Sequence, residues 1–303
     1  MTRPLETPPL ETHGVGKRYR RRWALRDCTL TIPERAIVGL AGPNGAGKST
    51  LLGLTVGLLA PTEGRVEVLG RDPRREPDVL ARVGYVARDA PLYRSFTVRD
   101  TLEFARATNP HWDGSIASEF LTRLPADRRV SALSAGERAR LALAVALGKR
   151  PALLLLDEPF ARLDPLAARE FLQLLMDGVS ELDATVVIAS HVIADIERVS
   201  DHIVLLSDGH VRLEGSVEEL LSSHRLLTGA ARPLGRIPGV QEIVRERHSG
   251  RQMTLLARLN GRVVDPSWSV DEIGLEDLLL AYMAPERLPG PRAPEKGRLR
   301  WHG

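Results

Sequence analysis

The chain has 303 residues, of which 43% are hydrophobic and 27% are charged, and 42 Lys and Arg against 39 Asp and Glu give a formal net charge of +3. This composition is typical of a soluble globular protein, and the length predicts about two domains. Cys28 is the only cysteine, which excludes a disulfide scaffold and fits a reducing compartment. We expect neither a secretion signal nor a membrane-spanning helix, because no apolar stretch approaches the ~18 to 20 residues that a span needs.

Arginine dominates the basic residues, since only four of the 42 are lysines. The alkaline isoelectric point of 9.3 therefore reflects a preference for arginine and not a nucleic-acid-binding stripe. A basic cluster at residues 18–22 contains Tyr19, but we expect no direct nucleic-acid binding there.

The first predicted elements surround a glycine-rich loop. Residues 1–11 are predicted to be a flexible leader, because they hold too little apolar surface to fold alone. Loosely alternating or continuous apolar residues predict strands, and apolar residues at helical spacing predict a helix that ends before Pro61. The predicted elements are strands at 23–32, 36–41 and 65–69 and a helix at 49–59. A strand, a glycine loop and a helix in this order begin a βα unit.

The middle of the chain is predicted to be helical and then to return to strands. Residues 94–150 are mostly helical in pattern, with Thr97 and Ser134 as N-caps, each followed three residues later by an acidic side chain. Residues 152–156 and 185–189 are short, fully apolar runs of the kind that a parallel sheet buries on both faces.

The C-terminal part of the chain differs from the rest in composition and in its pattern of predicted elements. A Ser-Asp-Gly turn at 207–209 predicts a hairpin, and Ser216 opens a further helix. Beyond residue 228, a Gly/Pro/Arg-rich connector, strands at 240–247 and 252–259 and a helix at 275–283 predict a small α+β domain. We expect residues 285–303 to be disordered, because they are rich in proline and basic residues.

The run Gly42-Pro43-Asn44-Gly45-Ala46-Gly47-Lys48-Ser49-Thr50 matches G-x-x-x-x-G-K-[ST] in full. It lies between a predicted strand and a predicted helix, where its backbone N–H groups and the helix N-terminus can bind phosphate oxygens. We expect Lys48 to reach the β- and γ-phosphates and the Ser49 hydroxyl to ligate Mg²⁺.

A second acidic element follows the apolar run at 153–156. Asp157 lies at the carboxyl end of that strand. We expect this strand to be the neighbour of the one that leads into the phosphate loop, so that Asp157 can bind the metal. Glu158 is placed to polarise a water molecule. Together the two elements predict a P-loop NTPase.

The segment Leu133-Ser134-Ala135-Gly136-Glu137 allows two interpretations. In the first interpretation, Ser134 and Glu137 form a capping box that only stabilises the start of a helix. A capped helix N-terminus with a glycine is also an anion site, which could hold the γ-phosphate of a nucleotide on another subunit.

These motifs, in this order, resemble the ATP-binding subunit of an ABC transporter over residues 12–227. The resemblance implies an α/β fold with a P-loop core of mostly parallel sheet, an N-terminal antiparallel β subdomain, an inserted helical subdomain at about 90–150, and a small C-terminal α+β domain at 228–284. It also implies two subunits that enclose two ATP molecules, as a homodimer or with a paralogous ATPase.

The resemblance also implies roles for individual residues. Tyr19 would stack on the adenine, and His191 and Asp164 correspond to the switch histidine and the D-loop. The implied catalytic residues are Glu158, His191 and Lys48, and the implied metal ligands are Ser49 and Asp157. The implied nucleotide contacts are Tyr19, Gly42, Pro43, Asn44, Gly45, Ala46, Gly47, Lys48, Ser49, Thr50, Arg88, Ser134, Gly136 and Asp164.

The sequence departs from the family pattern at Arg88, where members usually place a glutamine whose amide contacts Mg²⁺ and the attacking water. A guanidinium has no acceptor atom, so it cannot ligate a cation. Arg88 either contacts the γ-phosphate as an additional cation or points outward and pairs with Asp89. Retained activity with slowed turnover is our expectation.

The leading functional prediction is an ATPase subunit, cytoplasmic and peripheral on the inner face of the membrane, that powers a separate permease exporting drugs, lipids or peptides. Residues 109–113 and 221–227 resemble one group of bacterial exporter subunits. One alternative is a soluble ABC ATPase acting in translation or on DNA, which a single P-loop and the lack of a coiled coil disfavour. Another is an ATP-sensing module with weak hydrolysis.

Overall fold

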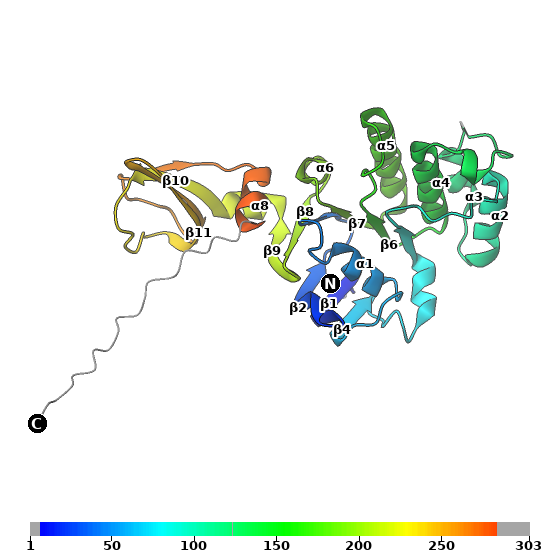
Figure 1. The fold of residues 1–303 in the computed structure, drawn as a ribbon, viewed down its shortest axis with the longest axis horizontal. Helices are drawn as coiled ribbons and strands as arrows, with labels where there is room; N and C mark the ends of the chain where they lie inside the picture. The colour runs from blue at the N-terminus through cyan, green and yellow to red at the C-terminus, as the bar shows by residue number, and fades with distance from the viewer. Residues whose placement is uncertain (1–6, 123, 284–303) are drawn as a thin grey trace, which may run out of the picture. The chain divides into compact units, whose positions relative to one another are not determined.

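The computed structural model describes residues 7–122 and 124–283, which form two compact units (Figure 1). The first unit ends at Val217 and the second begins at Glu218. Part of the expected leader and the expected disordered tail lie outside the described residues. The expected leader is too long at its C-terminal end, because strand β1 begins at Leu10.

A six-stranded sheet forms the centre of the first unit, in the order β5-β6-β7-β3-β8-β9. All neighbouring strands are parallel except β8 and β9, which form the predicted hairpin. The strands are β3 (Ile37–Ala41), β5 (Val83–Val86), β6 (Leu153–Asp157), β7 (Thr185–Ser190), β8 (His202–Ser207) and β9 (His210–Ser216). Every residue of β6 and β7 is buried, as their continuous apolar sequences predict.

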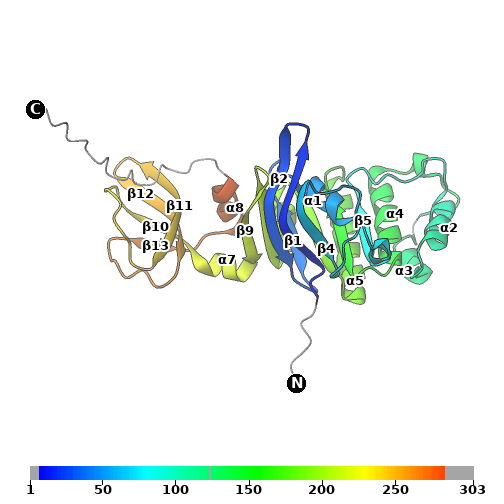
Figure 2. The same cartoon turned by 90° about the horizontal axis from the view of Figure 1, so that it is seen from below.

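A second, antiparallel sheet of three strands has the order β2-β1-β4. Its strands are β1 (Leu10–Tyr19), β2 (Arg22–Ile32) and β4 (Glu63–Val68). Figure 2 shows the three strands beside helix α1 (Lys48–Thr55), and apolar side chains of both sheets and of α1 share one core. The mostly parallel core and the antiparallel subdomain are confirmed.

The region from 77 to 197 supplies the other described helices of this unit. They are η1 (Pro77–Arg82), α2 (Val98–Thr108), α3 (Gly114–Glu119), η2 (Val130–Ala132), α4 (Ala135–Gly148), α5 (Pro165–Leu182) and α6 (Ile193–Glu197). Both predicted capping boxes are present, at Thr97 on α2 and at Ser134 on α4. Among the described residues, no helix combines the length and apolar character that crossing a membrane requires.

In the described part of the second unit, two helices accompany a four-stranded antiparallel sheet with the strand order β11-β12-β10-β13. Its elements are α7 (Val217–Ser223), β10 (His224–Ala230), β11 (Val240–Ser249), β12 (Gln252–Leu259), β13 (Ser269–Asp271) and α8 (Leu275–Met283). Buried side chains of this unit, including Leu227 and Met253 on the sheet and Trp268 just before β13, form a separate core. The boundary lies earlier than the expected residue 228, because β10 pairs with β12 and β13 and so belongs to this sheet.

Gly39, in the middle of the central strand β3, allows helix α6 to approach the sheet closely. A Cβ atom at this position would lie 2.0 Å from Cγ2 of Ile196 and 2.8 Å from Oγ of Ser200. Glycine in a strand interior usually marks such a close approach of another element. The strand that leads into the phosphate loop thus depends on a residue without a side chain.

We predict that Gly39→Ala lowers the free energy of unfolding by about 1 to 3 kcal/mol, because the added methyl group overpacks the contact with α6. Urea unfolding followed by circular dichroism measures the change. The matched control is Gly235→Ala, where a Cβ atom has no neighbour within 4 Å, and we expect it to change stability by less than about 0.5 kcal/mol. Equal effects of the two substitutions would contradict the packing argument.

Candidate functional site

The loop between β3 and α1 has the backbone that a phosphate-binding loop requires. Gly42, Gly45 and Gly47 all adopt positive φ angles, and Gly47 is the N-cap residue of α1 at φ 111°. A Cβ atom on Gly47 would lie 2.5 Å from Cδ2 of Leu25 and 2.6 Å from the carbonyl oxygen of Ala24. Only glycine fits there. The N–H groups at the start of an α-helix have no acceptor within the helix, so those of the first turn of α1 are suited to bind an anion.

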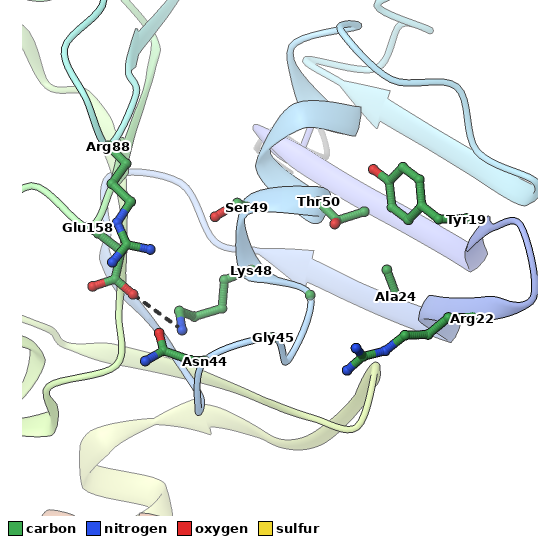
Figure 3. A pocket seen from close by; sticks show the side chains of 11 residues that line it. Tyr19, Arg22, Ala24, Asn44, Gly45, Lys48, Ser49, Thr50, Arg88 and Glu158 are labelled. Carbon is green, nitrogen blue, oxygen red and sulfur yellow. Dashed lines mark ion pairs between the residues drawn. The ribbon is translucent and has the colours of Figure 1, made fainter.

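A cavity of about 310 Å³ opens beside this loop (Figure 3). It is lined by Tyr19, Arg22, Ala24, Asn44, Gly45, Gly47, Lys48, Ser49, Thr50, Arg88 and Glu158. The structure therefore brings six of the nine predicted loop residues together with Tyr19 from the end of β1, Arg88 from after β5 and Glu158 from after β6. A pocket with a glycine loop on one side and charged side chains on the other suits a polyanionic ligand.

Ser49 and Asp157 meet at the predicted metal position. The Ser49 hydroxyl donates a hydrogen bond of 3.0 Å to Oδ1 of Asp157, whose residue is 4% exposed. Burial raises the pKa of Asp157, and the hydrogen bond from Ser49 offsets part of this effect. A hydroxyl and a carboxylate oxygen held together in this way are hard ligands of the kind that Mg²⁺ prefers, so the two residues fit the ion.

The expectation that Asp157 comes from the strand next to the phosphate loop is wrong, because β7 lies between β3 and β6. The two side chains still meet, because Ser49 is not at the end of β3 itself. It belongs to α1, which begins at Lys48 after the loop has left the end of β3.

Lys48 is folded back along its own loop. Its ammonium group donates hydrogen bonds to the carbonyl oxygens of Gly42 (2.7 Å) and Pro43 (3.3 Å). Oε1 of Glu158 lies 3.4 Å from the same nitrogen, and both side chains are about 5% exposed. Burial lowers the pKa of Lys48, whereas the carboxylate of Glu158 acts in the opposite direction.

Glu158 connects the lysine to the predicted switch histidine. Its Oε2 lies 2.7 Å from Nδ1 of His191, which follows β7, and its backbone N–H donates to the carbonyl of Ala189 at 2.9 Å. Glu158 also has a φ of +50°, a conformation that costs a non-glycine residue about 1 kcal/mol or more. Such strain at a buried carboxylate is typical of functional sites, and the carboxylate is placed to accept a proton within the cavity.

Arg88 faces the cavity, which it lines together with Glu158 (Figure 3). The neighbouring Asp89 pairs instead with Arg162, whose Nη2 lies 2.7 Å from Oδ1. The structure thus differs from the alternative in which Arg88 pairs with Asp89 at the surface. Burial is the main influence on the pKa of both Asp157 and Lys48, raising the first and lowering the second, and the positive charge of Arg88 makes a smaller contribution that favours a lower pKa in each.

Six predicted nucleotide contacts are not among the residues that line the cavity of this chain. Three of them, Gly42, Pro43 and Ala46, belong to the loop itself, and the other three lie elsewhere in the chain. Ser134 caps α4 by accepting a hydrogen bond from the backbone of Glu137, and Asp164 caps α5 by accepting from Leu166 and Ala167. Gly136 lies on the first turn of α4, where a Cβ atom would be 3.1 Å from that of Ala167. Ser134 and Asp164 are exposed, so both remain accessible to another molecule.

Sequence reasoning missed two lining residues, Arg22 and Ala24. Arg22 pairs with Tyr19 across a two-residue turn in which Arg20 has a φ of +52°. The short turn between β1 and β2 therefore brings the arginine back to the cavity. A prediction of the β1–β2 hairpin would have found it.

Asp157→Asn is predicted to stabilise the ligand-free protein at neutral pH. Because the pKa of Asp157 is raised above 3.8, its ionisation opposes folding; this cost is fully present above the raised pKa and disappears as the pH falls below 3.8. Asparagine keeps an acceptor for Ser49 without the charge. We expect a melting temperature at least about 2 °C higher at pH 7, with the difference shrinking toward pH 4.

Thermal unfolding by circular dichroism across this pH range measures the effect. Asp177→Asn is the control, because Asp177 is exposed on α5. A difference between wild type and Asp157→Asn that does not vary with pH would show that the buried charge is not its cause.

Comparisons with known proteins agree with this geometry. The family profile described as ABC transporter matches residues 25–161. The chain is 32% identical to the ABC transporter ATP-binding protein YtrB of Bacillus subtilis (strain 168), over 70% of this chain and 73% of YtrB. It is 34% identical to the sulfate/thiosulfate import ATP-binding protein CysA of Synechococcus elongatus, over 70% of this chain and only 63% of that relative's length.

The fold also matches solved structures of such cassettes. The dimeric bacterial ABC transporter cassette MJ0796 superposes with a TM-score of 0.61 at 28% identity, over 69% of this chain and 98% of the cassette. The same cassette is known as a dimer in a post-hydrolysis state with ADP and Pi, at the same score and identity. The loop geometry, the sheet order and these similarities agree with one another. The chain therefore belongs to the ABC transporter family and is an ATP-binding cassette with the ATPase activity of that family.

Proposed function

We propose that this chain hydrolyses ATP at a shared dimer interface in order to power a separate membrane permease. The observation that carries the proposal is the convergence of Ser49, Asp157, Lys48 and Glu158 on one side of the glycine loop. All residues that line the cavity lie between 19 and 158, within the first unit. We therefore assign the ATPase cassette to the first unit and treat the second as an accessory domain.

The proposed chemistry follows from the contacts of these side chains. The loop N–H groups would hold the phosphates, and Lys48 would exchange its carbonyl partners on Gly42 and Pro43 for phosphate oxygens. Ser49 and Asp157 would hold Mg²⁺, which when bound neutralises charge on the triphosphate. Glu158 would orient the attacking water and accept its proton.

His191 has a positioning role in this proposal. Its Nδ1 lies 2.7 Å from the Glu158 carboxylate on the side away from Lys48, because the lysine approaches Oε1 and the histidine Oε2. The carboxylate is therefore fixed between two partners before water arrives. Tyr19, which is 45% exposed at the rim of the cavity, would stack on the adenine.

The dimer completes the site in this proposal. Ser134, Gly136 and Asp164 lie outside the chain's own cavity, and Ser134 presents the N-terminus of α4. These residues would contact the nucleotide that a second subunit binds, as a capped helix start is suited to do. The dimeric MJ0796 cassette supports this arrangement, which a homodimer or a pair with a paralogous ATPase would satisfy.

The finer proposal concerns the permease and the direction of transport. Export of drugs, lipids or peptides rests on the resemblance of residues 109–113 and 221–227 to bacterial exporter subunits. Import is the second candidate, because the relative CysA is named as a sulfate/thiosulfate import protein. Both candidates place the chain at the inner face of the membrane, bound to the permease.

Arg88→Gln is predicted to increase steady-state turnover by at least about threefold, or about 0.65 kcal/mol in the barrier. The reason is that an amide supplies an oxygen to the metal and the attacking water, which a guanidinium cannot do. Phosphate release under saturating ATP measures the rate. Asp89→Asn, which removes the partner of Arg162 without touching the cavity, is the control; identical rates in wild type and Arg88→Gln would remove Arg88 from the mechanism.

Purification of the tagged chain from membranes tests the transporter proposal. We expect a stoichiometric polytopic membrane protein in the eluate, identified by mass spectrometry, and ATPase activity that changes when that protein is reconstituted with the chain in liposomes. Identification of the permease then distinguishes export from import by the direction of ATP-dependent substrate movement. Elution with ribosomes or DNA, and without a membrane protein, would overturn the proposal.

A further inference from the structure

A histidine and two glutamates gather on the antiparallel sheet, outside the nucleotide cavity. Glu11 and His13 are two residues apart on β1, so they share a face of the strand, opposite to the buried Leu10 and Thr12. Glu67 on β4 is the direct cross-strand partner of Glu11. Figure 2 shows the two strands side by side. One nitrogen of His13 and one carboxylate oxygen of each glutamate all lie within 4.8 Å of one another.

The imidazole of His13 gives an independent indication of a ligand. Its Nε2 atom is buried and has no hydrogen-bond partner among the described residues. Nearly all buried polar side-chain atoms in proteins have a partner, and one that lacks it points to a bound ion or water. An imidazole nitrogen without a proton is also among the commonest ligands of transition metals.

The charges of the cluster also call for a cation. Like charges directly opposite each other on an antiparallel pair are unfavourable, and Glu11 and Glu67 occupy such positions. Arg65 donates from Nε to Oε1 of Glu67 at 2.8 Å, which leaves the second oxygen of that carboxylate for another partner. Within the described residues, no ion pair reaches the carboxylate of Glu11, so one negative charge is left without compensation.

We propose that Glu11, His13 and Glu67 form a binding site for a divalent transition metal, with Zn²⁺ as the best fit. One nitrogen and two carboxylate oxygens are a ligand set that zinc accepts, with a water molecule in the fourth position, whereas Mg²⁺ prefers oxygen alone. Glu11 supplies the uncompensated negative charge, and Glu67 offers its second oxygen while it stays paired with Arg65. Ligand atoms of a tetrahedral zinc lie about 3.3 Å apart, and rotation of the two partly exposed glutamate side chains closes the difference.

The site would join strands that are far apart in the sequence. A metal on Glu11, His13 and Glu67 links β1 to β4 across the chain segment that contains the phosphate loop and α1. Strand β1 ends at Tyr19, which lies at the rim of the nucleotide cavity. Binding to the folded state alone would therefore stabilise the sheet that positions this tyrosine.

The test uses the full chain, treated with a chelator and kept free of nucleotide. Zn²⁺ is titrated by calorimetry, and Co²⁺ is used as a spectroscopic probe of the ligand set. We expect His13→Gln and Glu11→Gln to weaken Zn²⁺ binding at this site by at least about tenfold and to lose the corresponding Co²⁺ absorption. His111→Gln is the matched control, because His111 is exposed and lies outside the cluster.

Thermal unfolding provides a second readout. Zn²⁺ should raise the melting temperature of wild type and His111→Gln, and should leave that of His13→Gln unchanged. Glu11→Gln retains the histidine, so loss of binding in this variant with an unaltered circular dichroism spectrum shows that misfolding is not the cause. The proposal is overturned if wild type binds no Zn²⁺, or if wild type and His13→Gln bind the same number of ions with the same affinity.

Discussion

Three charged side chains, Lys48, Asp157 and Glu158, are removed from water at the carboxyl edge of the central sheet, each about 5% exposed or less. Buried charges are costly unless they are paired and hydrogen-bonded, and here each has a specific partner. Lys48 contacts loop carbonyls and Glu158, Asp157 accepts from Ser49, and Glu158 contacts His191. The ends of three strands must converge for these contacts to exist, so the sheet order is a condition for the site.

Several local features are unfavourable for folding but serve this arrangement. Glu158 adopts a positive φ, the pKa of Asp157 is raised by burial, and the loop needs glycine where a side chain would collide with Leu25. Binding sites that hold charged side chains in place for a ligand commonly lower the stability of the fold in this way. Gly39 differs from these features, because its missing side chain lets α6 pack closely against β3 next to the loop and so favours the fold.

Local patterns predicted much of the structure, because the signals are local. The bounds of β12 and α8 and the capping boxes of α2 and α4 agree with the sequence interpretation, since turns, apolar periodicity and caps involve neighbouring residues. Strand β1 was missed because two glycines and several polar residues dilute its alternation, and Arg22 was missed with it.

Long-range order was less accessible to the sequence. The position of β7 between β3 and β6 depends on pairing between residues more than one hundred positions apart, which no local pattern encodes. The boundary before β10 likewise depends on its pairing with β12. In the candidate site, the phosphate loop and the acidic pair Asp157 and Glu158 could be predicted from local motifs. The direction of the Arg88 side chain could not, because it depends on the pairing of Asp89 with the distant Arg162.

The central claim is that the buried carboxylate of Glu158 performs proton chemistry in a cavity that binds Mg²⁺-ATP through other groups. The most direct measurement compares wild type with Glu158→Gln, by calorimetric titration with Mg²⁺-ATP and by single-turnover release of phosphate. The account predicts ATP affinities within about threefold of each other and hydrolysis at least about one hundredfold slower in the variant. Equal rates of hydrolysis, or a wild-type chain that does not bind ATP, would contradict it.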